Sequence, residues 1–312
     1  MDNNVPGPAM APRLFRFDDI DSFRSSVRHV NVDFTPLARK ASAEQVILNL
    51  PGFDVNYTKS FPRIIDAQLK PNCTAVGFSM DDGVPIRFNG IERDRSIIVV
   101  GNGGAAYSAV ERTPRQYASI VFTPELENRG WPQTGTNFGI YETSAAAHHR
   151  LRQLVLQILS LSFPDASKVA EASVAIRESL LAAVDMALTN MTNARWASRA
   201  NASPQFKIFR DVQAVLDGDI AHAVYSGDLA REIGVSVRTL HDTMQRYRGM
   251  SLHRYLRLRR LWLVRKQLLA GTHSVKASAL AFGFWHLGDF SKYYRAQFGE
   301  LPSETAARSR HV

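Results

Sequence analysis

The most chemically crowded segment of the sequence is GFWHLGDFSKYYRAQFGELPS, residues 283–303. Its His286, Asp289 and Lys292 are residue types that can bind a metal ion or transfer protons. The same segment carries aromatic residues at four-residue spacing, beginning at Phe290, and this spacing is typical of a helix that packs one face. The choice between a chemical site and a helix with a recognition surface depends on the elements that position these residues.

Groups that could support catalysis elsewhere are few and dispersed. Cys73 is the only cysteine and no histidine adjoins it, so we interpret it as a small strand residue and exclude a disulfide or a cysteine-rich zinc site. The segment 34–147 holds no histidine, which excludes a histidine-based metal centre there. His148 and His149 would point about 100° apart on a helix, and GNGGAAYS (101–108) lacks the Lys-Ser/Thr of a phosphate loop. We therefore predict no catalytic residue, no metal, no cofactor and no enzymatic activity.

A chain of 312 residues, 45% hydrophobic and 21% charged, is long enough for two domains with separate cores. The longest mainly apolar stretch, 151–163, is shorter than the ~20 residues that a membrane span requires. Residues 1–12 lack the cationic and apolar regions of a signal peptide. These features predict a cytoplasmic protein with no membrane partner.

The net charge of +9 is concentrated in the last third of the chain. Residues 206–312 contain 17 Lys and Arg against 9 Asp and Glu, whereas residues 1–205 contain 21 against 20. A compact module with such an excess is typical of a protein that contacts a phosphate backbone. The alternative is a cationic surface that serves only solubility.

The elements that precede this module change character along the chain. Short β-rich runs separated by turn residues follow one another over 53–123 at spacings of roughly ten residues, which predicts an antiparallel sandwich or small barrel. After it, 148–188 places Leu, Val and Ile at three- and four-residue spacing and predicts helices. The polar segment 192–204 is interpreted as an interdomain linker, beyond which the chain is expected to be helical.

A weak internal repeat decides how the cationic third is organised. LAREIGVSVRTLHDTMQRYRGMSL (229–252) aligns with ALAFGFWHLGDFSKYYRAQFGELP (279–302), about 50 residues later and with one extra residue in the turn. The aligned pairs are Ala230 with Ala279, Gly234 with Gly283, Leu240 with Phe290, Met244 with Tyr294, and Gly249 with Gly299.

Each copy has the parts of a helix-turn-helix. A short helix with a small residue at the crossing is followed by a glycine suited to the turn and then by a second helix with one apolar face. The packing face of the first copy is expected to be Leu240, Met244 and Tyr247, and that of the second Phe290, Tyr294 and Phe298. Between the copies, 252–271 predicts one long helix whose outer face carries Arg254, Arg257, Arg260 and Lys266.

Two such units on one connecting helix resemble the C-terminal module of the AraC/XylS family of bacterial transcription regulators. The resemblance covers about 206–308. Its specific part is GFWHLGDFSKYYRAQFGELPS, which is close to the variant of the subgroup that includes the ethanolamine-utilisation regulator. The resemblance implies that double-stranded DNA is the partner and that the second helix of each unit enters one of two consecutive major grooves.

The resemblance also implies which residues face the DNA. On the first unit these are Ser236, Arg238, Thr239, His241, Asp242, Gln245 and Arg246, and on the second they are Gly288, Asp289, Ser291, Lys292 and Arg295. Arg and Lys can donate to guanine, and a carboxylate can accept from cytosine.

Several of these residues have alternative roles. Asp242 lies four residues from both Arg238 and Arg246, so an intrahelical ion pair competes with a base contact. Asp289 lies in the first turn of its helix, where its charge favours the helix dipole. Trp285 is interpreted as a packed residue of the turn.

The same resemblance suggests a role for the first two thirds of the chain. In this family a cupin-like β domain often binds a small effector and the helices after it often mediate dimerisation. We therefore predict a sequence-specific DNA-binding transcriptional regulator, an activator, that forms a homodimer and senses an unidentified small molecule. RNA polymerase is a further candidate partner. The alternatives are an N-terminal domain that binds a protein partner and an enzyme domain fused to a DNA-targeting module.

The predicted fold class is α+β with two domains. A cupin-like antiparallel β-barrel or sandwich with linker helices is followed by an all-α double helix-turn-helix. The predicted boundaries are a flexible tail and lead-in at 1–28, a β-rich effector-sensing domain at 29–145, a helical linker or dimerisation region at 146–191, an interdomain linker at 192–204, and a DNA-binding domain at 205–312 with its two units at about 226–249 and 275–299.

Overall fold

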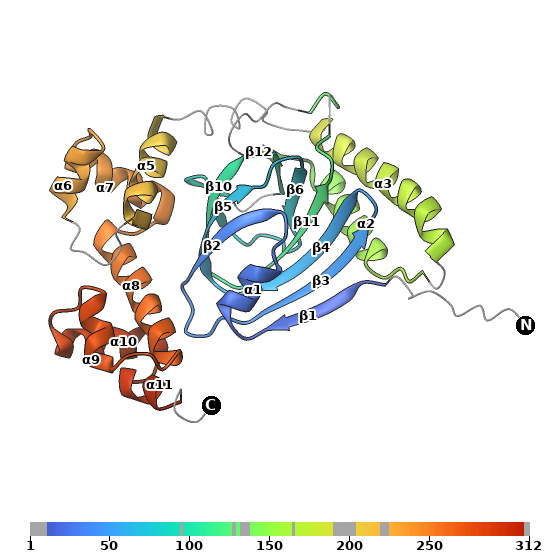
Figure 1. Ribbon diagram of the computed structural model, residues 1–312. Coiled ribbons are helices and arrows are strands. Elements are labelled where there is room, and N and C mark those ends of the chain that lie inside the picture. The colour runs from blue at the N-terminus through green and yellow to red at the C-terminus, as the bar shows by residue number, and fades with distance from the viewer. Residues whose placement is uncertain are drawn as a thin grey trace, which may run out of the picture. The chain divides into compact units, whose positions relative to one another are not determined.

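The structure is a computed structural model, and it describes residues 11–93, 96–126, 129–131, 138–163, 166–189, 204–218 and 225–308. The chain divides into two compact units, an N-terminal one of residues 1–34 and 41–202 and a C-terminal one of residues 35–40 and 203–312 (Figure 1). Residues 192–203 of the predicted interdomain linker, and residues 1–10 of the predicted tail, lie outside the described residues.

The N-terminal unit is built from two antiparallel sheets (Figure 1). The larger sheet has the order β1 (Arg13–Phe17), β3 (Ala43–Leu50), β4 (Phe53–Ser60), β11 (Arg115–Phe122), β6 (Thr74–Ser79), β9 (Ile97–Asn102), β12 (Gly139–Glu142). The smaller sheet has the order β2 (Val30–Pro36), β5 (Arg63–Leu69), β10 (Ala106–Glu111), β7 (Ile86–Phe88), β8 (Ile91–Arg93). The pairing joins strands within each sheet, so the unit is a sandwich.

Alternation along the strands sends side chains to two different cores. On β11, Val121 belongs to the core between the sheets, whereas Ala118, Ile120 and Phe122 belong to a second core on the outer face of the larger sheet. Successive residues of a strand point to opposite faces, so one strand supplies both cores. β11 is central in its sheet, and its last three residues, Ile120 to Phe122, form a continuous apolar run that is buried on both faces.

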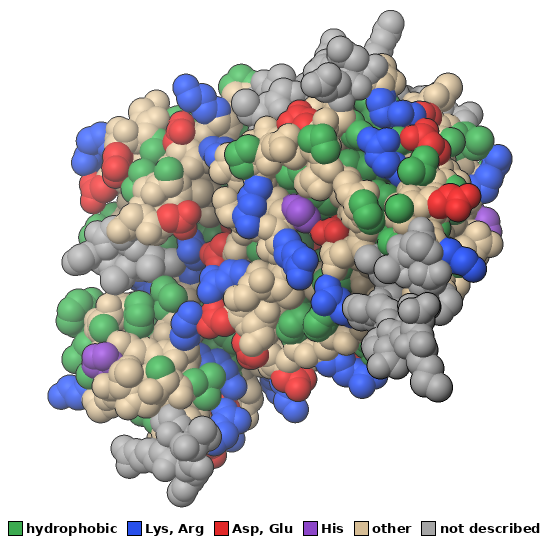
Figure 2. Space-filling model, turned by 45° about the vertical axis from the view of Figure 1, so that its right-hand side comes forward, with side chains coloured by type: hydrophobic (Ala, Val, Ile, Leu, Met, Phe, Trp, Pro, Cys, Tyr) green, Lys and Arg blue, Asp and Glu red, His purple; other side chains and the backbone are tan. Residues whose placement is uncertain are grey.

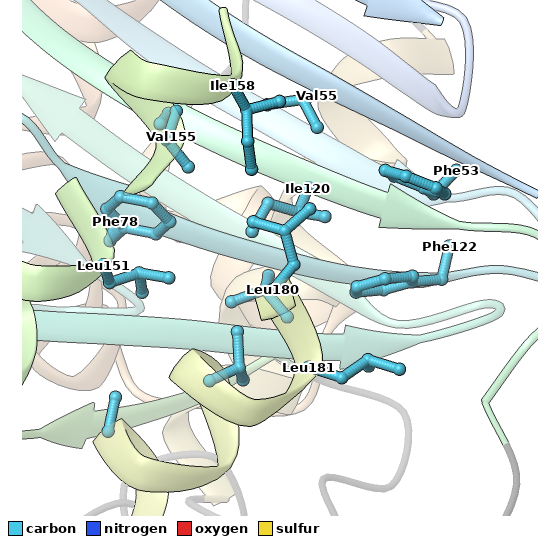
Figure 3. Packing of buried hydrophobic residues seen from close by; sticks show 14 of the residues in the cluster. Phe53, Val55, Phe78, Ile120, Phe122, Leu151, Val155, Ile158, Leu180 and Leu181 are labelled. Atoms are coloured by element: carbon cyan, nitrogen blue, oxygen red, sulfur yellow. The ribbon is translucent and has the colours of Figure 1, made fainter. Parts of the chain in front are cut away.

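Two helices complete the second core. α2 (Ala145–Ile158) and α3 (Ala166–Thr189) place Leu151, Val155, Leu180 and Leu181 against the larger sheet (Figure 3). The Ser144 hydroxyl accepts a hydrogen bond from the Ala147 amide at 3.2 Å and caps α2. The two helices therefore belong to the fold of the N-terminal unit.

Residues 13–26, within the segment predicted as tail and lead-in, form β1 and α1 (Ile20–Ser26). β1 pairs with β3 along its length, with Arg13 opposite Ile47 and Phe17 opposite Ala43. The fully buried Phe23 anchors α1 in the core between the sheets.

The buried His148 of α2 predicts an acid-sensitive N-terminal unit. Burial, with the nearby Arg152 charge, lowers the pKa of His148 from 6.5 to about 4. Because the unfolded chain takes up this proton first, the stability that the neutral imidazole supports is lost as the pH falls from about 6.5 to about 4. The full loss is about 3 kcal/mol.

This effect can be isolated by urea unfolding at pH 7 and pH 5. The wild-type protein should lose about 2 kcal/mol more than the His148→Leu variant over this range, because leucine takes up no proton. His149→Leu, which changes the exposed neighbour, is the matched control and should behave like the wild type. Equal losses in the wild type and His148→Leu would show that His148 does not cause the acid sensitivity.

In the described part of residues 203–312, the C-terminal unit consists of helices joined by short turns. Its helices are α5 (Pro204–Gly218), α6 (Ser226–Glu232), α7 (Val237–Arg248), α8 (Leu252–Leu269), α9 (Val275–Ala281), α10 (Leu287–Phe298) and α11 (Pro302–Arg308). With the β-sandwich before it, this arrangement confirms the predicted α+β fold class, in its sandwich form.

Candidate DNA-binding surface

The first helix-turn-helix consists of α6 and α7. Gly234 takes a φ of 70° in the turn, a conformation that a side chain disfavours. The Ser236 hydroxyl then accepts a hydrogen bond from the Thr239 amide at 3.0 Å and caps α7, which ends at Gly249 with a φ of 64°. The predicted packing residues Leu240, Met244 and Tyr247 are buried, which confirms the apolar face.

The second helix-turn-helix consists of α9 and α10 and repeats these features. Gly283 in the turn has a φ of 76°, and Gly299 ends α10 with the same φ. The packing residues Phe290, Tyr294 and Phe298 are buried, as predicted. His286 occupies the N-cap position of α10 without a side-chain hydrogen bond to the helix, so its imidazole is not used for capping.

The helix α8 connects the two helix-turn-helix units and forms part of the core of each. Its buried Tyr255 donates a hydrogen bond to Gln213 Oε1 of α5 at 3.0 Å, and the guanidinium of the fully buried Arg248 lies 4.8 Å from the Tyr255 ring centre. Leu261, Val264 and Leu268, also on α8, pack with the aromatic face of α10. One rigid element thus positions both recognition helices, α7 and α10.

A polar cluster holds the C-terminal end of α10. Glu300 accepts hydrogen bonds from Arg265 Nη1 at 2.5 Å and from Thr305 Oγ1 at 2.7 Å, and it also pairs with Arg308. Burial acts to raise the pKa of Glu300, but the Thr305 and Arg265 hydrogen bonds outweigh it and lower that pKa. The Tyr294 hydroxyl joins the cluster by a 2.8 Å hydrogen bond to Thr305 Oγ1.

The outward faces of α7 and α10 carry most of the predicted DNA-contacting side chains. Exposed residues on the first unit are Ser236, Arg238, His241, Asp242 and Gln245, and on the second they are Gly288, Asp289, Lys292 and Arg295. Each recognition helix therefore separates a buried apolar face from an exposed polar one.

Ion pairs along these faces are long and exposed. Arg238 Nε lies 3.9 Å from Asp242 Oδ2, and these side chains are 91% and 67% exposed. On α10, Lys292 Nζ lies 3.8 Å from Asp289 Oδ1. Such surface pairs contribute about 0–1 kcal/mol, so each cation can turn to a phosphate or base at little cost.

Other predicted residues have partners within the protein. Arg246 is half-buried and donates a hydrogen bond to Gln205 Oε1 of α5. Thr239 is half-buried and its hydroxyl lies 2.8 Å from that of Ser236 at the cap of α7. The Ser291 hydroxyl donates to the Leu287 carbonyl at 3.0 Å, inside α10.

Trp285 is a correction to the sequence interpretation. It was expected to pack in the turn, but 70% of it is exposed. The core of this unit is instead filled by Phe284, whose ring centre lies 5.0 Å from that of Phe290. The alternating exposure of adjacent aromatic residues in a turn cannot be derived from helical spacing.

Two further exposed side chains beside the recognition surface escaped the sequence analysis. Val237, the first residue of α7, is 41% exposed, and Tyr293 of α10 is 40% exposed with the Arg257 guanidinium 4.3 Å from its ring centre. Val237 lies three residues before Leu240 but is the first residue of α7, where few neighbours cover it, so helical spacing alone does not predict its exposure.

Charge on the molecular surface is mixed in sign. Figure 2 shows Lys and Arg side chains interspersed with Asp and Glu over the face in view. On the outer side of α8, Arg254 and Lys266 are exposed, whereas Arg257 and Arg260 are half-buried.

Among the residues that the structure describes, no three His, Cys, Asp or Glu side chains are grouped as metal ligands would be. None of the described helices has the length and apolar content needed to cross a membrane.

Comparison with known proteins places this surface in a recognised domain. Residues 229–308 match a helix-turn-helix domain family. The XylDLEGF operon transcriptional activator 1 of Pseudomonas putida is 28% identical over 199 residues, covering 62% of this chain and 57% of the relative. The transcriptional activator RhaS of Pectobacterium atrosepticum is 26% identical over 218 residues, covering 68% of this chain and 72% of the relative.

A solved structure, a probable AraC family transcriptional regulator from Rhodopseudomonas palustris, is 32% identical. It aligns with 33% of this chain and 97% of its own, with a TM-score of 0.32. The chain spans little more than half the length of the first Pseudomonas putida relative, and a match to another activator of that name covers 35% of that protein.

Proposed function

We propose that this protein, which belongs to the AraC/XylS family through its C-terminal helix-turn-helix unit, regulates transcription by binding double-stranded DNA. The observation that carries the proposal is the pair of helices α7 and α10, each with an exposed polar face that includes Arg or Lys, packed against the apolar face of one helix, α8. An α-helix fits the major groove, so two helices on a common support suit two consecutive grooves.

Selection of genomic fragments by the purified protein tests this function. Specific fragments should be retained in the presence of excess competitor DNA. Retention of all sequences alike would contradict sequence-specific regulation. The genes beside the retained fragments would also indicate the pathway that is regulated.

We assign base contacts to Arg238, His241 and Gln245 of α7 and to Lys292 and Arg295 of α10, because these long side chains are exposed. Ser236 and Thr239 contribute through the start of α7, Ser291 through its hydrogen bond within α10, and Arg246 through its hydrogen bond to Gln205 of α5. The exposed Gly288 lets the first turn of α10 approach the DNA closely, and Asp242 and Asp289 orient the neighbouring cations.

Lys292→Ala should weaken specific DNA binding about 5- to 150-fold, because one charge-assisted contact to a base is worth about 1–3 kcal/mol. Titration of a selected fragment in a gel-shift or fluorescence assay measures this effect. Lys207→Ala, which removes an exposed cation of α5, is the matched control and should change the affinity less than twofold. Equal effects of the two substitutions would remove Lys292 from the recognition surface.

For the N-terminal unit we propose that a small molecule binds the sandwich and that the signal reaches transcription as activation, with RNA polymerase as the partner. The protein would act in the bacterial cytoplasm, where its DNA lies. DNA affinity measured with and without a metabolite panel separates this role from binding of a protein partner. Catalytic turnover of a metabolite by the N-terminal unit would support the other alternative, an enzyme domain fused to a DNA-targeting module.

We propose that α2 and α3 also mediate a homodimer. Exposed apolar side chains on these helices are Leu156, Val174 and Met186, and Val174 is 65% exposed. Sedimentation of the wild-type protein should give a dimer mass that dissociates on dilution, and the double variant Leu156→Glu/Val174→Glu should sediment as a monomer. A wild-type monomer mass at every concentration would contradict the dimer.

A further inference from the structure

We propose that the cavity between the two sheets binds a small organic anion, a monocarboxylate with a compact apolar body, whose charged end is held by Arg63 and Arg115. This inference rests on the proposed sensing role of the N-terminal unit and names the chemical class of its ligand.

The cavity has a volume of about 170 Å³ and lies wholly within the N-terminal unit. An apolar cavity of about 150 Å³ can hold a benzene molecule, and pockets for drug-sized ligands are roughly 300–1,000 Å³. The ligand is therefore small, about one ring or a short chain with its head group. Apolar side chains that line the cavity include Val32, Phe34, Ile47, Ile65, Val99 and Phe138.

Arg63 is a charged side chain with unused donors at the cavity wall. It begins β5 of the smaller sheet and is 1% exposed. Its Nη2 atom lies 3.3 Å from Glu111 Oε2, but its Nε and Nη1 atoms are buried without a hydrogen-bond partner. Four aromatic rings, of Phe23, Phe34, Phe61 and Tyr117, have their centres within 5.6 Å of the guanidinium carbon and hold it in place.

Arg115 approaches the same point from the other sheet. It begins β11, and its Nη1 and Nη2 atoms donate to the Val84 carbonyl and the Ser79 hydroxyl, each at 2.7 Å. Its Nε atom is buried without a hydrogen-bond partner, 3.9 Å from Glu111 Oε1. Burial lowers the pKa of Arg115, which means that its charged form is poorly solvated where it stands.

The buried charges around Glu111 are unequal. Two buried guanidinium groups lie within 4 Å of one buried carboxylate, that of Glu111, which is 3% exposed. The half-buried Asp81 also acts on the charge of Arg115, but its Oδ2 atom accepts a hydrogen bond from the Gln116 amide. The other titratable pair at the wall, His29 and Asp54, is joined at 2.7 Å, and Arg28 is exposed to solvent. A buried charge without a counterion is costly, and unpaired guanidinium donors match a carboxylate in geometry. One monovalent anion would therefore satisfy both the charge and the free donors.

The same contacts connect the cavity to α2. The Arg115 partners Ser79 and Val84 enclose a short segment whose Met80 carbonyl and Asp82 carboxylate both accept hydrogen bonds from Arg152 of α2. A carboxylate that draws Arg115 toward the cavity therefore acts on the segment that anchors α2, one of the helices proposed to form the dimer.

Calorimetry on the full-length protein tests the ligand class. The probes are hexanoate, cyclohexanecarboxylate and benzoate, each beside its primary amide, which has nearly the same shape and no charge. At least one acid should bind, and its amide should bind at least about tenfold more weakly, because the amide lacks the charge that the arginines complement. An amide that binds as tightly as its acid, or no binding by any of the acids, would overturn the proposal.

Substitutions test which side chains determine the affinity for the acid. Arg63→Met and Arg115→Met should each weaken the acid at least about tenfold, whereas Glu111→Gln should tighten it because the competing carboxylate is removed. Arg16→Gln, which changes an arginine with a 72% exposed side chain on the same unit, should have no effect. If an arginine variant does not fold, the proposal is still tested by two measurements. These are the comparison of each acid with its amide and the affinity of the Glu111→Gln variant for the acid. Weaker acid binding by Glu111→Gln would overturn the proposal.

The same samples should be assayed for retention of selected DNA fragments. Loss of the acid preference with DNA binding intact overturns the ligand class alone. Loss of specific DNA binding with the acid preference intact overturns the regulatory function and leaves the cavity as an anion site.

Discussion

Phe290→Ala is expected to lower the free energy of unfolding of the C-terminal unit by about 3–5 kcal/mol. Phe290 is 1% exposed, and its ring packs against Phe284 and Tyr294 at centre distances of 5.0 and 5.6 Å. Alanine would leave a cavity beneath α10, the helix that carries Lys292 and Arg295. Since a domain of this size is stable by about 5–15 kcal/mol, the second recognition helix would lose much of its support.

Urea unfolding combined with hydrogen exchange of the α8 and α10 amides measures this loss and assigns it to the C-terminal unit. Tyr293→Ala is the matched control, because it removes an exposed aromatic ring from the same helix. Its cost should not exceed about 1 kcal/mol, the value of its exposed contact with Arg257. Similar costs for the two substitutions would mean that the buried aromatic face does not support α10.

Specific DNA affinity is expected to fall about 10³- to 10⁵-fold between 50 and 200 mM salt. This range corresponds to roughly six to ten neutralised phosphates, whose counterions are released on binding. The cations of residues 206–312, which outnumber the anions 17 to 9, are numerous enough to provide these contacts. Filter binding or fluorescence titration of one selected fragment across the salt series gives the slope directly.

Single substitutions show how much each cation contributes to the dependence of DNA affinity on salt. Removing a cation that contacts a phosphate, for which Arg254 is a candidate, should reduce the salt slope by about one. Lys207→Ala should leave the slope unchanged. A specific complex whose affinity does not vary with salt would contradict binding through the phosphate backbone.

The C-terminal unit could be predicted from the sequence because local chemistry determines most of it. Turn glycines such as Gly234 and Gly283, the cap at Ser236 and the periodic stripe from Phe290 each leave a short-range pattern. Helical spacing does not determine exposure where a helix begins. Trp285 lies two residues before α10 and Val237 is the first residue of α7, and at both places coverage by neighbours, and not helical phase, decides exposure.

The N-terminal cavity could not be predicted from the sequence. Arg63 and Asp66 make β5 look like a solvent-exposed segment, yet Arg63 is buried by rings from α1, β2 and β11. Its meeting with Arg115 at Glu111 depends on strands from different sheets coming together. Contacts between residues distant in sequence leave no pattern in residue spacing, so only the folded structure reveals the unequal charge in the cavity.

The most direct test of the account is methylation interference at guanine N7 on the selected DNA fragments, because N7 lies in the major groove. Two recognition helices on one support predict two groups of interfering guanines on one face of the DNA, about 10 base pairs apart. Lys292→Ala should weaken only one of the groups. A single group that is indifferent to Lys292, or the absence of any interfering guanine on retained fragments, would contradict the double helix-turn-helix account.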